Sequence, residues 1–321
     1  MDQTYPTISI IMATYNRAHF IVETLQSIQA QTHTNWECLI IDDGSTDKTA
    51  EILKSILKED SRFQYHKRTP NYKKGLPGSR NYGLDLAKGN YIIFFDDDDI
   101  VHPLCLEISL SVFNMINDIS FCNYKKEAFF ETFNYNLIDN SKEFHLEIAN
   151  NDLLENVITQ KIPFASCTVL WKKDCFEEHT FNEDLMYAEE WECYQRILSN
   201  NPKGVIIDKV LYYNRKHANS NTGEFWKGDA VRVASQKKAI TLVVSNLHKK
   251  QLLTPYLFKY LVNYAISFRD FKLVKNILNI TNAKLNVKIL FKLKYQLFPA
   301  WILTTKVKKR LLKLNILQNL S

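Results

Sequence analysis

Three apolar runs in the first hundred residues each end in a cluster of polar side chains. The runs lie at residues 8–13, 38–41 and 91–95, and the polar clusters follow at 14–16, 42–47 and 96–99. A continuous apolar run is typical of a strand buried on both faces, and helical spacing separates the runs. This order implies a parallel sheet whose ligands bind beyond the carboxyl ends of the strands. The sequence therefore predicts an α/β fold with a ligand site where the three clusters meet.

The rest of the chain changes character twice. Residues 119–213 mix strand-like runs with helical spacing, and we interpret them as the second half of the same domain. The strand-like runs lie at 119–124, 128–133, 167–171 and 204–208, and the helical stretches near 151–159 and 189–198. From about Trp226 onward the spacing is helical with interleaved lysines. We therefore expect two domains, an α/β domain at residues 1–225 and a helical extension at 226–321.

Composition is typical of a folded enzyme from a reducing compartment. The chain has 321 residues, 45% of them hydrophobic and 24% charged, which is enough for a full α/β core. Six cysteines are scattered without a CxxC pair, so we expect free, buried thiols and no disulfide frame or zinc site. The start lacks a secretory signal, and no uncharged apolar run approaches the roughly 18–20 residues that cross a bilayer. The expected location is cytoplasmic.

The net charge of +6 conceals two oppositely charged parts. Residues 249–321 hold 15 Lys or Arg and one acid, Asp270, which gives +14, while the remainder sums to −8. Apolar residues alternate with lysines at 287–294 and 307–314, and three aromatic residues lie between these stretches: Tyr295, Phe298 and Trp301. This pattern predicts helices in a membrane interface, where each basic residue contributes about 1 kcal/mol on an anionic surface. One alternative is RNA binding, although the apolar content is high for a surface that follows phosphates. The other is a helical dimerisation or packing domain.

Four adjacent aspartates, Asp96 to Asp99, follow the third apolar run directly. Like charges within a few ångströms raise one another's pKa or recruit a cation. Mg²⁺ prefers carboxylate oxygens and shares its coordination shell with substrate phosphates. The cluster therefore predicts a divalent-cation site, with a solvated acidic turn as the alternative.

Three segments in order resemble one enzyme family. ISIIMATYNR, LIIDDGSTDKT and GSRNYGLDLAKGNYIIFFDDDD are similar to the nucleotide-binding half of family 2 glycosyltransferases, densely over residues 8–103 and not beyond about Thr222. That family has the GT-A fold, a Rossmann-like, mostly parallel sheet with flanking helices. The resemblance implies an inverting glycosyltransferase that uses a divalent metal, Mn²⁺ or Mg²⁺, and a nucleotide-sugar donor. We expect a UDP-sugar donor, and a lipid-linked or polysaccharide acceptor in the synthesis of a surface glycan at the inner face of a bacterial membrane.

The resemblance assigns the nucleotide site residue by residue. Ala13 and Tyr15 correspond to the edge of the base pocket, and Asp43 to the acceptor of a hydrogen bond from the base N3–H, which suits uracil or thymine. Arg80, at the start of a predicted helix, would face the nucleotide. The alternatives are a packing role for the Tyr15 ring and a turn-forming role for Asp43 before Gly44. Asp42 is expected to be mainly structural.

The same resemblance divides the aspartate cluster. Asp96 and Asp98 match the family's D-x-D pair, with Asp96 near the ribose and both as candidate metal ligands. The middle position is itself an aspartate, Asp97, so it joins the residues expected to contact the donor. The metal assignment could therefore shift by one residue along the chain.

Inverting transfer is a single displacement that needs a carboxylate to take the acceptor's proton and a Lewis acid for the departing diphosphate. Residues 187–192 resemble the family's E-D motif before a Trp, with Glu where Asp is usual. Glu190 matches the base and Glu189 its neighbour. The alternative is a pair of acids that complement the dipole of a helix N-terminus. Glu183 and Asp184 form a second acidic pair that we rank below them.

LYYNRKHANSNT resembles the family's Y-x-R-x-H-x-x-S loop. It would bring Arg215 and His217 to the diphosphate, with His217 as a phosphate or metal contact, in a polar loop able to close over the donor. A plain surface loop is the alternative. The expected partners are thus the nucleotide-sugar, a glycan or lipid-linked acceptor and a membrane surface. Nucleic acid is not expected, and a homodimer remains open.

Rival enzyme classes lack sequence support. A processive synthase would need transmembrane helices and a Q-x-x-R-W motif. In this chain Gln195 and Arg196 are adjacent, so they do not form that motif. A nucleotidyltransferase that makes a nucleotide-sugar would usually carry an early glycine-rich loop, and residues 13–17 have no glycine. A carboxylate-pair glycosidase needs no nucleotide pocket. A non-catalytic nucleotide-binding or interaction protein would tolerate loss of the aspartates, which are all present.

Overall fold

The computed structural model describes residues 7–217 and 220–297. Contacts divide the chain into two compact units, and the boundary between Ala239 and Ile240 lies inside helix α8 (Ala230–Lys249). The first unit holds the sheet and the second is helical, and each is described by itself below.

The first half of the sheet is the parallel array expected from the apolar runs. Its strands are β1 (Ile8–Thr14), β2 (Trp36–Asp42), β3 (Phe63–Lys67) and β4 (Tyr91–Phe95), in the order β3-β2-β1-β4. All residues of β2 are buried, because helices cover both faces of a parallel sheet. The register pairs Thr14 with Asp42 and Met12 with Phe95. The carboxyl ends, with the polar clusters that follow them, therefore lie together at one edge.

The second half of the sheet is mixed. Its strands are β5 (Ile100–Val101), β6 (Phe121–Phe130), β7 (Leu146–Ile148), β8 (Val169–Lys172) and β9 (Gly204–Lys216). The order continues from β4 through β8, β6 and β9 to β5, with β7 also paired to β9. Strand β8 is antiparallel to both β4 and β6, whereas β6 and β9 are parallel.

Two local predictions were wrong in this half. The separate strands expected at 119–124 and 128–133 form the continuous strand β6, with register shifts near Lys125. The segment LYYNRK, expected as part of a loop, is the end of β9. In both cases pairing between β6 and β9, some eighty residues apart in sequence, extends the strands beyond the limits that the local apolar pattern indicates.

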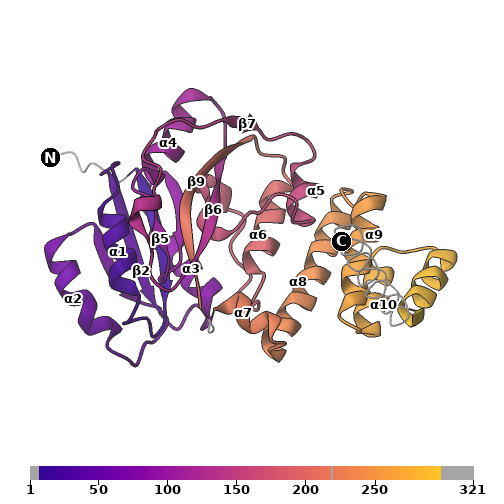
Figure 1. The fold of residues 1–321 in the computed structure, drawn as a ribbon. Helices are drawn as coiled ribbons and strands as arrows, with labels where there is room; N and C mark the ends of the chain where they lie inside the picture. The colour runs from indigo at the N-terminus through magenta and orange to yellow at the C-terminus, as the bar shows by residue number, and fades with distance from the viewer. Residues whose placement is uncertain (1–6, 218–219, 298–321) are drawn as a thin grey trace, which may run out of the picture. The chain divides into compact units, whose positions relative to one another are not determined.

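Helices cover both faces of the sheet (Figure 1). The helices of this unit are α1 (Ile21–Gln29), α2 (Thr49–Glu59), α3 (Leu76–Leu86), α4 (Cys105–Met115), α5 (Leu153–Ile158), α6 (Glu189–Leu198) and α7 (Asn221–Trp226). One buried apolar cluster joins the sheet to α1, α2 and α4, and another joins it to α3, α5 and α6. The result is the predicted α/β sandwich. The six cysteines are free, and all but Cys175 are buried, as expected.

Helix α3 packs unusually close to the sheet. A Cβ atom at Gly83 would lie 2.4 Å from Cγ2 of Ile11 on β1, so only glycine fits there without displacement. This contact fixes the helix that carries Arg80 against the strand that leads to Tyr15.

The second unit confirms the helical pattern predicted after Trp226. It contains α9 (Pro255–Ser267), α10 (Phe271–Ile280) and a further helical stretch at 285–297. Leu261 and Val262 of α9 and Val274 and Ile277 of α10 are fully buried. Within the described part of the chain, no helix is both long and apolar enough to cross a membrane. The predicted basic stretch 307–314, Phe298 and Trp301 lie outside the described residues.

Candidate active site

The loops after β1 and β2 are tied to each other. Asn16, which has a left-handed backbone (φ 54°), accepts hydrogen bonds at Oδ1 from the backbone N–H of Thr46 (2.8 Å) and Asp47 (3.3 Å). Its own N–H donates to Oγ of Ser45 (2.9 Å). Asparagine tolerates this backbone conformation better than most residues. The first two polar clusters predicted to converge therefore form one connected rim.

The two aspartates at the end of β2 have different partners. Asp42 accepts hydrogen bonds from the backbone N–H of Gly44 (3.0 Å) and Ser45 (2.7 Å) and from the Tyr65 hydroxyl, which gives it the structural role expected. Asp43 pairs with Nε of Arg68 and accepts the N–H of Gly75 (2.9 Å). Its carboxylate is therefore held rigidly at the rim.

The aromatic ring of Tyr15 is not part of the core. It is 43% exposed, and Nζ of Lys74 lies 4.6 Å from the ring centroid. Ala13, two residues earlier, is half-buried. An exposed ring beside a small residue is available to stack on a planar ligand, so the packing alternative for Tyr15 is not supported.

Each aspartate of the third cluster has its own set of partners. Asp97 accepts a hydrogen bond from Nε of Arg17 (3.2 Å). Asp99 is fully buried and accepts the backbone N–H of Arg215 (2.7 Å) and the side-chain amide of Asn214 (3.2 and 3.1 Å).

The other two aspartates keep more of their coordinating capacity. Oδ2 of Asp98 lies 2.9 Å from Nε2 of His217 and 3.6 Å from Nη2 of Arg17. Asp96 lies 3.4 Å from Nη2 of Arg80, and its side chain is 37% exposed. These two aspartates are the predicted D-x-D pair.

Burial and mutual repulsion raise the pKa values within this cluster. Burial, and then the charge of Asp98, raise the pKa of Asp97 to about 7 despite the nearby Arg17. Burial and the charge of Asp98 also raise the pKa of Asp96, where Arg80 opposes the shift. Burial and the charges of Asp96 and Asp98 raise the pKa of Asp99 well above its usual range. A cluster that resists ionisation in this way is stabilised by a bound cation.

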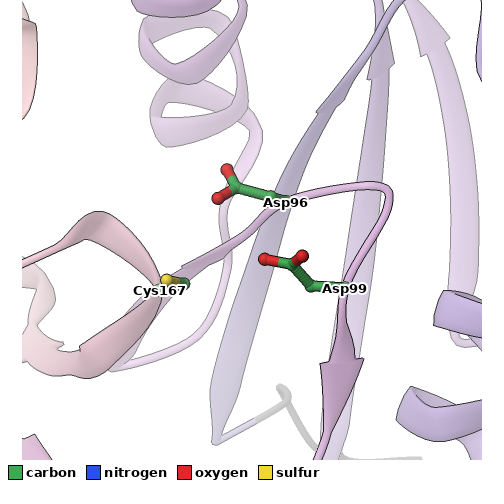
Figure 2. Close-up of side chains that lie close together, drawn as sticks. All are labelled: Asp96, Asp99 and Cys167. Atoms are coloured by element: carbon green, nitrogen blue, oxygen red, sulfur yellow. The ribbon is translucent and has the colours of Figure 1, made fainter. Parts of the chain in front are cut away.

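Three groups near the cluster lie close enough to share a metal ion. Ligand atoms of Asp96, Asp99 and Cys167 lie within 4.8 Å of one another, and Figure 2 shows both carboxylates on the same side of the turn with Cys167 beside them. However, burial raises the pKa of the Cys167 thiol to about 12, and both oxygens of Asp99 already accept hydrogen bonds. The oxygens of Asp96 and Asp98 with the imidazole of His217 form a donor set that fits a divalent cation better.

The two glutamates predicted to include the general base lie at the start of helix α6. Glu189 is 1% exposed, and Nη1 of Arg80 donates to it (2.8 Å). The same guanidinium reaches Oγ of Ser166 (2.9 Å) and Asp96 (3.4 Å) through Nη2. Arg80 therefore connects the start of α6 to the aspartate cluster, and its predicted contact with the nucleotide remains a prediction.

The two glutamates differ in accessibility. Burial and the adjacent Glu190 raise the pKa of Glu189, and the Arg80 ion pair offsets only part of this rise. Glu190 is half-buried, and no ion pair involving it occurs among the described residues. Because a general base must reach the acceptor hydroxyl, the more open Glu190 suits that role better than the enclosed Glu189.

The acidic pair ranked lower is engaged elsewhere. Glu183 accepts hydrogen bonds from the side-chain amide of Asn81 (2.9 Å) and the backbone N–H of Lys73 (2.7 Å). Asp184 pairs with Lys73 and with Lys238 (2.7 Å). These contacts join the loop before α6 to the loop beside Asp43, so both acids have structural roles.

Arg215 is enclosed behind the aspartate turn. Its guanidinium donates to the backbone carbonyls of Asp98 (2.8 Å) and Glu131 (2.7 Å) and pairs with Glu23. These contacts make it a positioning residue for the turn, because only 6% of its surface is exposed. The contact of Arg215 with the diphosphate remains a prediction. His217, in contrast, contacts the Asp98 carboxylate directly.

Several site residues were missed from the sequence. Arg17 was visible in the segment TYNR but was assigned no role, although it pairs with Asp97 and Asp98. Arg68 lies in a loop without a recognisable pattern, and Tyr212 is one apolar residue among many in β9. The Tyr212 hydroxyl accepts the backbone N–H of Asp96 (3.1 Å). Only the folded chain brings these groups to the site.

Comparison with known proteins supports a single family. The family model described as Glycosyl transferase family 2 matches residues 9–179. The chain is 35% identical over 221 residues to an uncharacterized glycosyltransferase of Rickettsia felis, over 67% of this chain and 34% of that protein. It is 30% identical over 266 residues to the Escherichia coli UDP-Glc:alpha-D-GlcNAc-diphosphoundecaprenol beta-1,3-glucosyltransferase WfaP, over 82% and 97% of the two chains. The chain spans about a third of the length of the first curated relatives it matches.

Solved structures confirm the fold. Staphylococcus aureus TarS 1-349 in complex with UDP-GlcNAc has a TM-score of 0.65 at 20% identity, covering 85% of this chain and 79% of that one. The mannosyltransferase PcManGT from Pyrobaculum calidifontis, in complex with GDP-Man and Mn²⁺, has a TM-score of 0.58 at 15% identity, covering 92% and 81%. At these identities the likeness concerns the arrangement of elements, and it confirms the expected GT-A fold.

The raised pKa of Asp97 predicts a pH-dependent stability. The folded state keeps the Asp97 proton at pH values where the unfolded chain has lost it, so the free energy of unfolding should fall as pH rises from about 4 to about 7. Asp97→Asn removes this titration. Its free energy of unfolding in EDTA should depend less on pH and exceed that of the wild type at pH 8, by at most about 4 kcal/mol. Denaturant unfolding at several pH values measures both slopes, and equal slopes would contradict the assignment.

Proposed function

The chain belongs to glycosyl transferase family 2, and on that premise we propose that it transfers one sugar from a nucleotide-sugar, with inversion, to a hydroxyl of a lipid-linked or polysaccharide acceptor. One observation carries the proposal. Asp43 after β2 offers a rigid carboxylate to the nucleobase, and Asp96 and Asp98 after β4 offer an incompletely neutralised pair to a cation. Glu190 offers an accessible carboxylate at the start of α6, which Arg80 joins to the aspartate turn. Donor binding, departure of the leaving group and activation of the acceptor need these three kinds of group.

The donor would bind across the ends of β1 and β2. The Tyr15 ring offers a stacking surface, and Asp43 offers an acceptor for the N3–H of uracil, held in place by Arg68 and Gly75. A UDP-sugar is the preferred donor, because the E. coli relative is named for UDP-Glc and the S. aureus structure contains UDP-GlcNAc. Ala13 would line the same pocket.

A divalent cation, Mn²⁺ or Mg²⁺, would be held by Asp98, Asp96 and His217. When bound, it would supply Lewis-acid stabilisation of the diphosphate that departs. Two carboxylates suit Mn²⁺ or Mg²⁺, and the P. calidifontis structure contains Mn²⁺. Arg215 and Arg17 would keep the aspartate turn in shape around it.

The acceptor would be activated by Glu190. Its carboxylate takes the proton of the acceptor hydroxyl while that oxygen forms a bond to the anomeric carbon. On the opposite face of the sugar the bond to the phosphate oxygen breaks, and the diphosphate leaves with the electron pair. Glu189 would act indirectly, because it holds the Arg80 guanidinium that connects α6 to Asp96.

The acceptor would be presented at the cytoplasmic face of a membrane, where the protein binds peripherally. The E. coli relative is named for a diphosphoundecaprenol-linked acceptor. In the helical unit, large apolar side chains are exposed at 285–297 next to lysines: Leu285, Ile289, Leu290, Leu293 and Leu297 with Lys288, Lys292 and Lys294. Apolar insertion and Coulomb attraction to anionic lipid favour the same surface.

The base assignment predicts a split between two neighbouring variants. Glu190→Gln should bind donor normally but lose turnover by about 10²–10⁴-fold, which is the usual contribution of general-base catalysis. Glu189→Gln should lose less, since the amide can still accept a hydrogen bond from Arg80. Turnover and donor affinity measured for both proteins test the assignment. If Glu190→Gln keeps wild-type turnover while Glu189→Gln loses it, the base is Glu189.

The cation site predicts metal-dependent nucleotide binding. UDP should raise the thermal midpoint of the wild type more in Mn²⁺ than in EDTA. The rise with UDP should be larger than the rise with GDP or TDP. Asp98→Ala should abolish the metal-dependent part while the fold is kept, and Asp208→Ala, at an exposed aspartate of β9, should behave as wild type. Full stabilisation and full activity in EDTA would exclude a role for the metal.

The exposed apolar face of the helical unit predicts lipid binding. The full chain should co-sediment with vesicles that contain anionic lipid and bind neutral vesicles less. High salt should release it only partly, because the Debye length falls from about 10 Å at 0.1 M to about 3 Å at 1 M while apolar insertion persists. Ile289→Ser with Leu293→Ser should weaken sedimentation, and Leu137→Ser, at an exposed leucine of the first unit, should not. A chain that ignores anionic vesicles would have a dimerisation or packing element here.

A further inference from the structure

Lys126 lies at an irregular position in strand β6. The register between β6 and β9 shifts between Asn123 and Lys125 and again between Lys125 and Lys126. Such bulges redirect side chains and are frequent beside active sites. Lys126 is opposite Tyr212, and the Tyr212 hydroxyl accepts the backbone N–H of Asp96. The irregularity therefore lies next to the strand that contacts the aspartate turn.

The ammonium group of Lys126 contacts Cys167, which borders the carboxylate cluster. Its Nζ lies 3.7 Å from Sγ of Cys167, and that sulfur lies within 4.8 Å of carboxylate oxygens of Asp96 and Asp99. Figure 2 draws Asp96, Asp99 and Cys167. Much of Lys126 is exposed, so solvent and ligands can approach it. Like an ordinary lysine, it is charged at neutral pH.

Lys126 differs from the other cations of the site in its pairing. Arg17, Arg80 and Arg215 each pair with a carboxylate within the fold. Across residues 7–217 and 220–297, no ion pair with Lys126 occurs, and its contact at Nζ is with a thiol that burial keeps neutral. The ammonium therefore retains hydrogen-bond donors for an anionic ligand.

The order of strands places Lys126 away from the nucleotide pocket. The rim residues Tyr15 and Asp43 follow β1 and β2, the aspartate turn follows β4, and β8 and β6 come next in the sheet. Lys126 thus lies on the side of the turn away from the proposed base pocket, within electrostatic range of Glu190, the proposed general base.

We propose that Lys126 binds a phosphate oxygen of the acceptor, in the diphosphate that joins the acceptor sugar to its lipid carrier. This rests on the proposed function. A phosphorylated acceptor has to approach six acidic side chains, at positions 96–99, 189 and 190, and an ammonium on its side offsets that repulsion. Lysine is a common phosphate-binding point charge, and the guanidinium groups nearby are already occupied.

Two acceptors that differ in one group test the proposal. One is N-acetylglucosamine joined to an alkyl chain through a diphosphate, and the other is the neutral glycoside of the same sugar and chain. Lys126→Met should lower kcat/KM for the diphosphate acceptor by about 10–100-fold, mainly through KM, and leave the neutral glycoside and the acceptor-free hydrolysis of the donor unchanged. Lys126→Arg should retain most of the activity.

Lys125→Met is the matched control. Lys125 is exposed, and within the described part of the chain no hydrogen bond or ion pair joins its side chain to the aspartate turn, so this variant should behave as wild type with both acceptors. Equal losses on both acceptors, together with slower donor hydrolysis, would assign Lys126 to the donor diphosphate and overturn the proposal. No loss with either acceptor would also overturn it while the proposed function stands. A wild type that glycosylates neither acceptor would instead contradict the proposed acceptor class.

Discussion

Repulsion among carboxylates at one edge of the sheet is the constraint on which the rest of the site depends. Four aspartates and two glutamates lie at this edge, and burial raises the pKa of most of those that are enclosed. The fold limits the repulsion with Arg17 on Asp97 and with Arg80 between Asp96 and Glu189. On Asp99 the donors are the backbone N–H of Arg215 and the side-chain amide of Asn214. Repulsion that the protein compensates only in part at Asp96 and Asp98 favours a cation, and this is the physical basis of the metal proposal.

Arg80 gives this arrangement a second consequence. One guanidinium contacts Asp96 after β4, Ser166 before β8 and Glu189 at the start of α6. Three segments from distant parts of the chain therefore depend on one side chain, which Gly83 brings close to β1 by allowing tight packing of α3. The aspartate turn and the start of α6 are thus held by the same guanidinium.

The parts of the fold that could be predicted are those encoded locally. The runs that became β1, β2 and β4 are apolar throughout and end in polar residues, so both the strands and the convergence of their ends follow from the pattern. Helix α6 begins at Glu189, as its acidic start and helical spacing indicate. The parts that could not be predicted depend on long-range pairing. The merging of two runs into β6, the extension of β9 through Arg215 and the placing of Arg68 on Asp43 involve partners far apart in sequence, and no local pattern encodes them.

The stereochemistry of the product tests the central claim most directly. A single displacement with Glu190 as base must invert the anomeric carbon, because the acceptor oxygen enters opposite the departing diphosphate. With a UDP-sugar whose sugar is α-linked to the diphosphate, proton NMR of the purified product should show a β-linkage, identified by the large coupling constant of the anomeric proton for a gluco-configured sugar. An α-linked product would require a different mechanism and would contradict this account of the site.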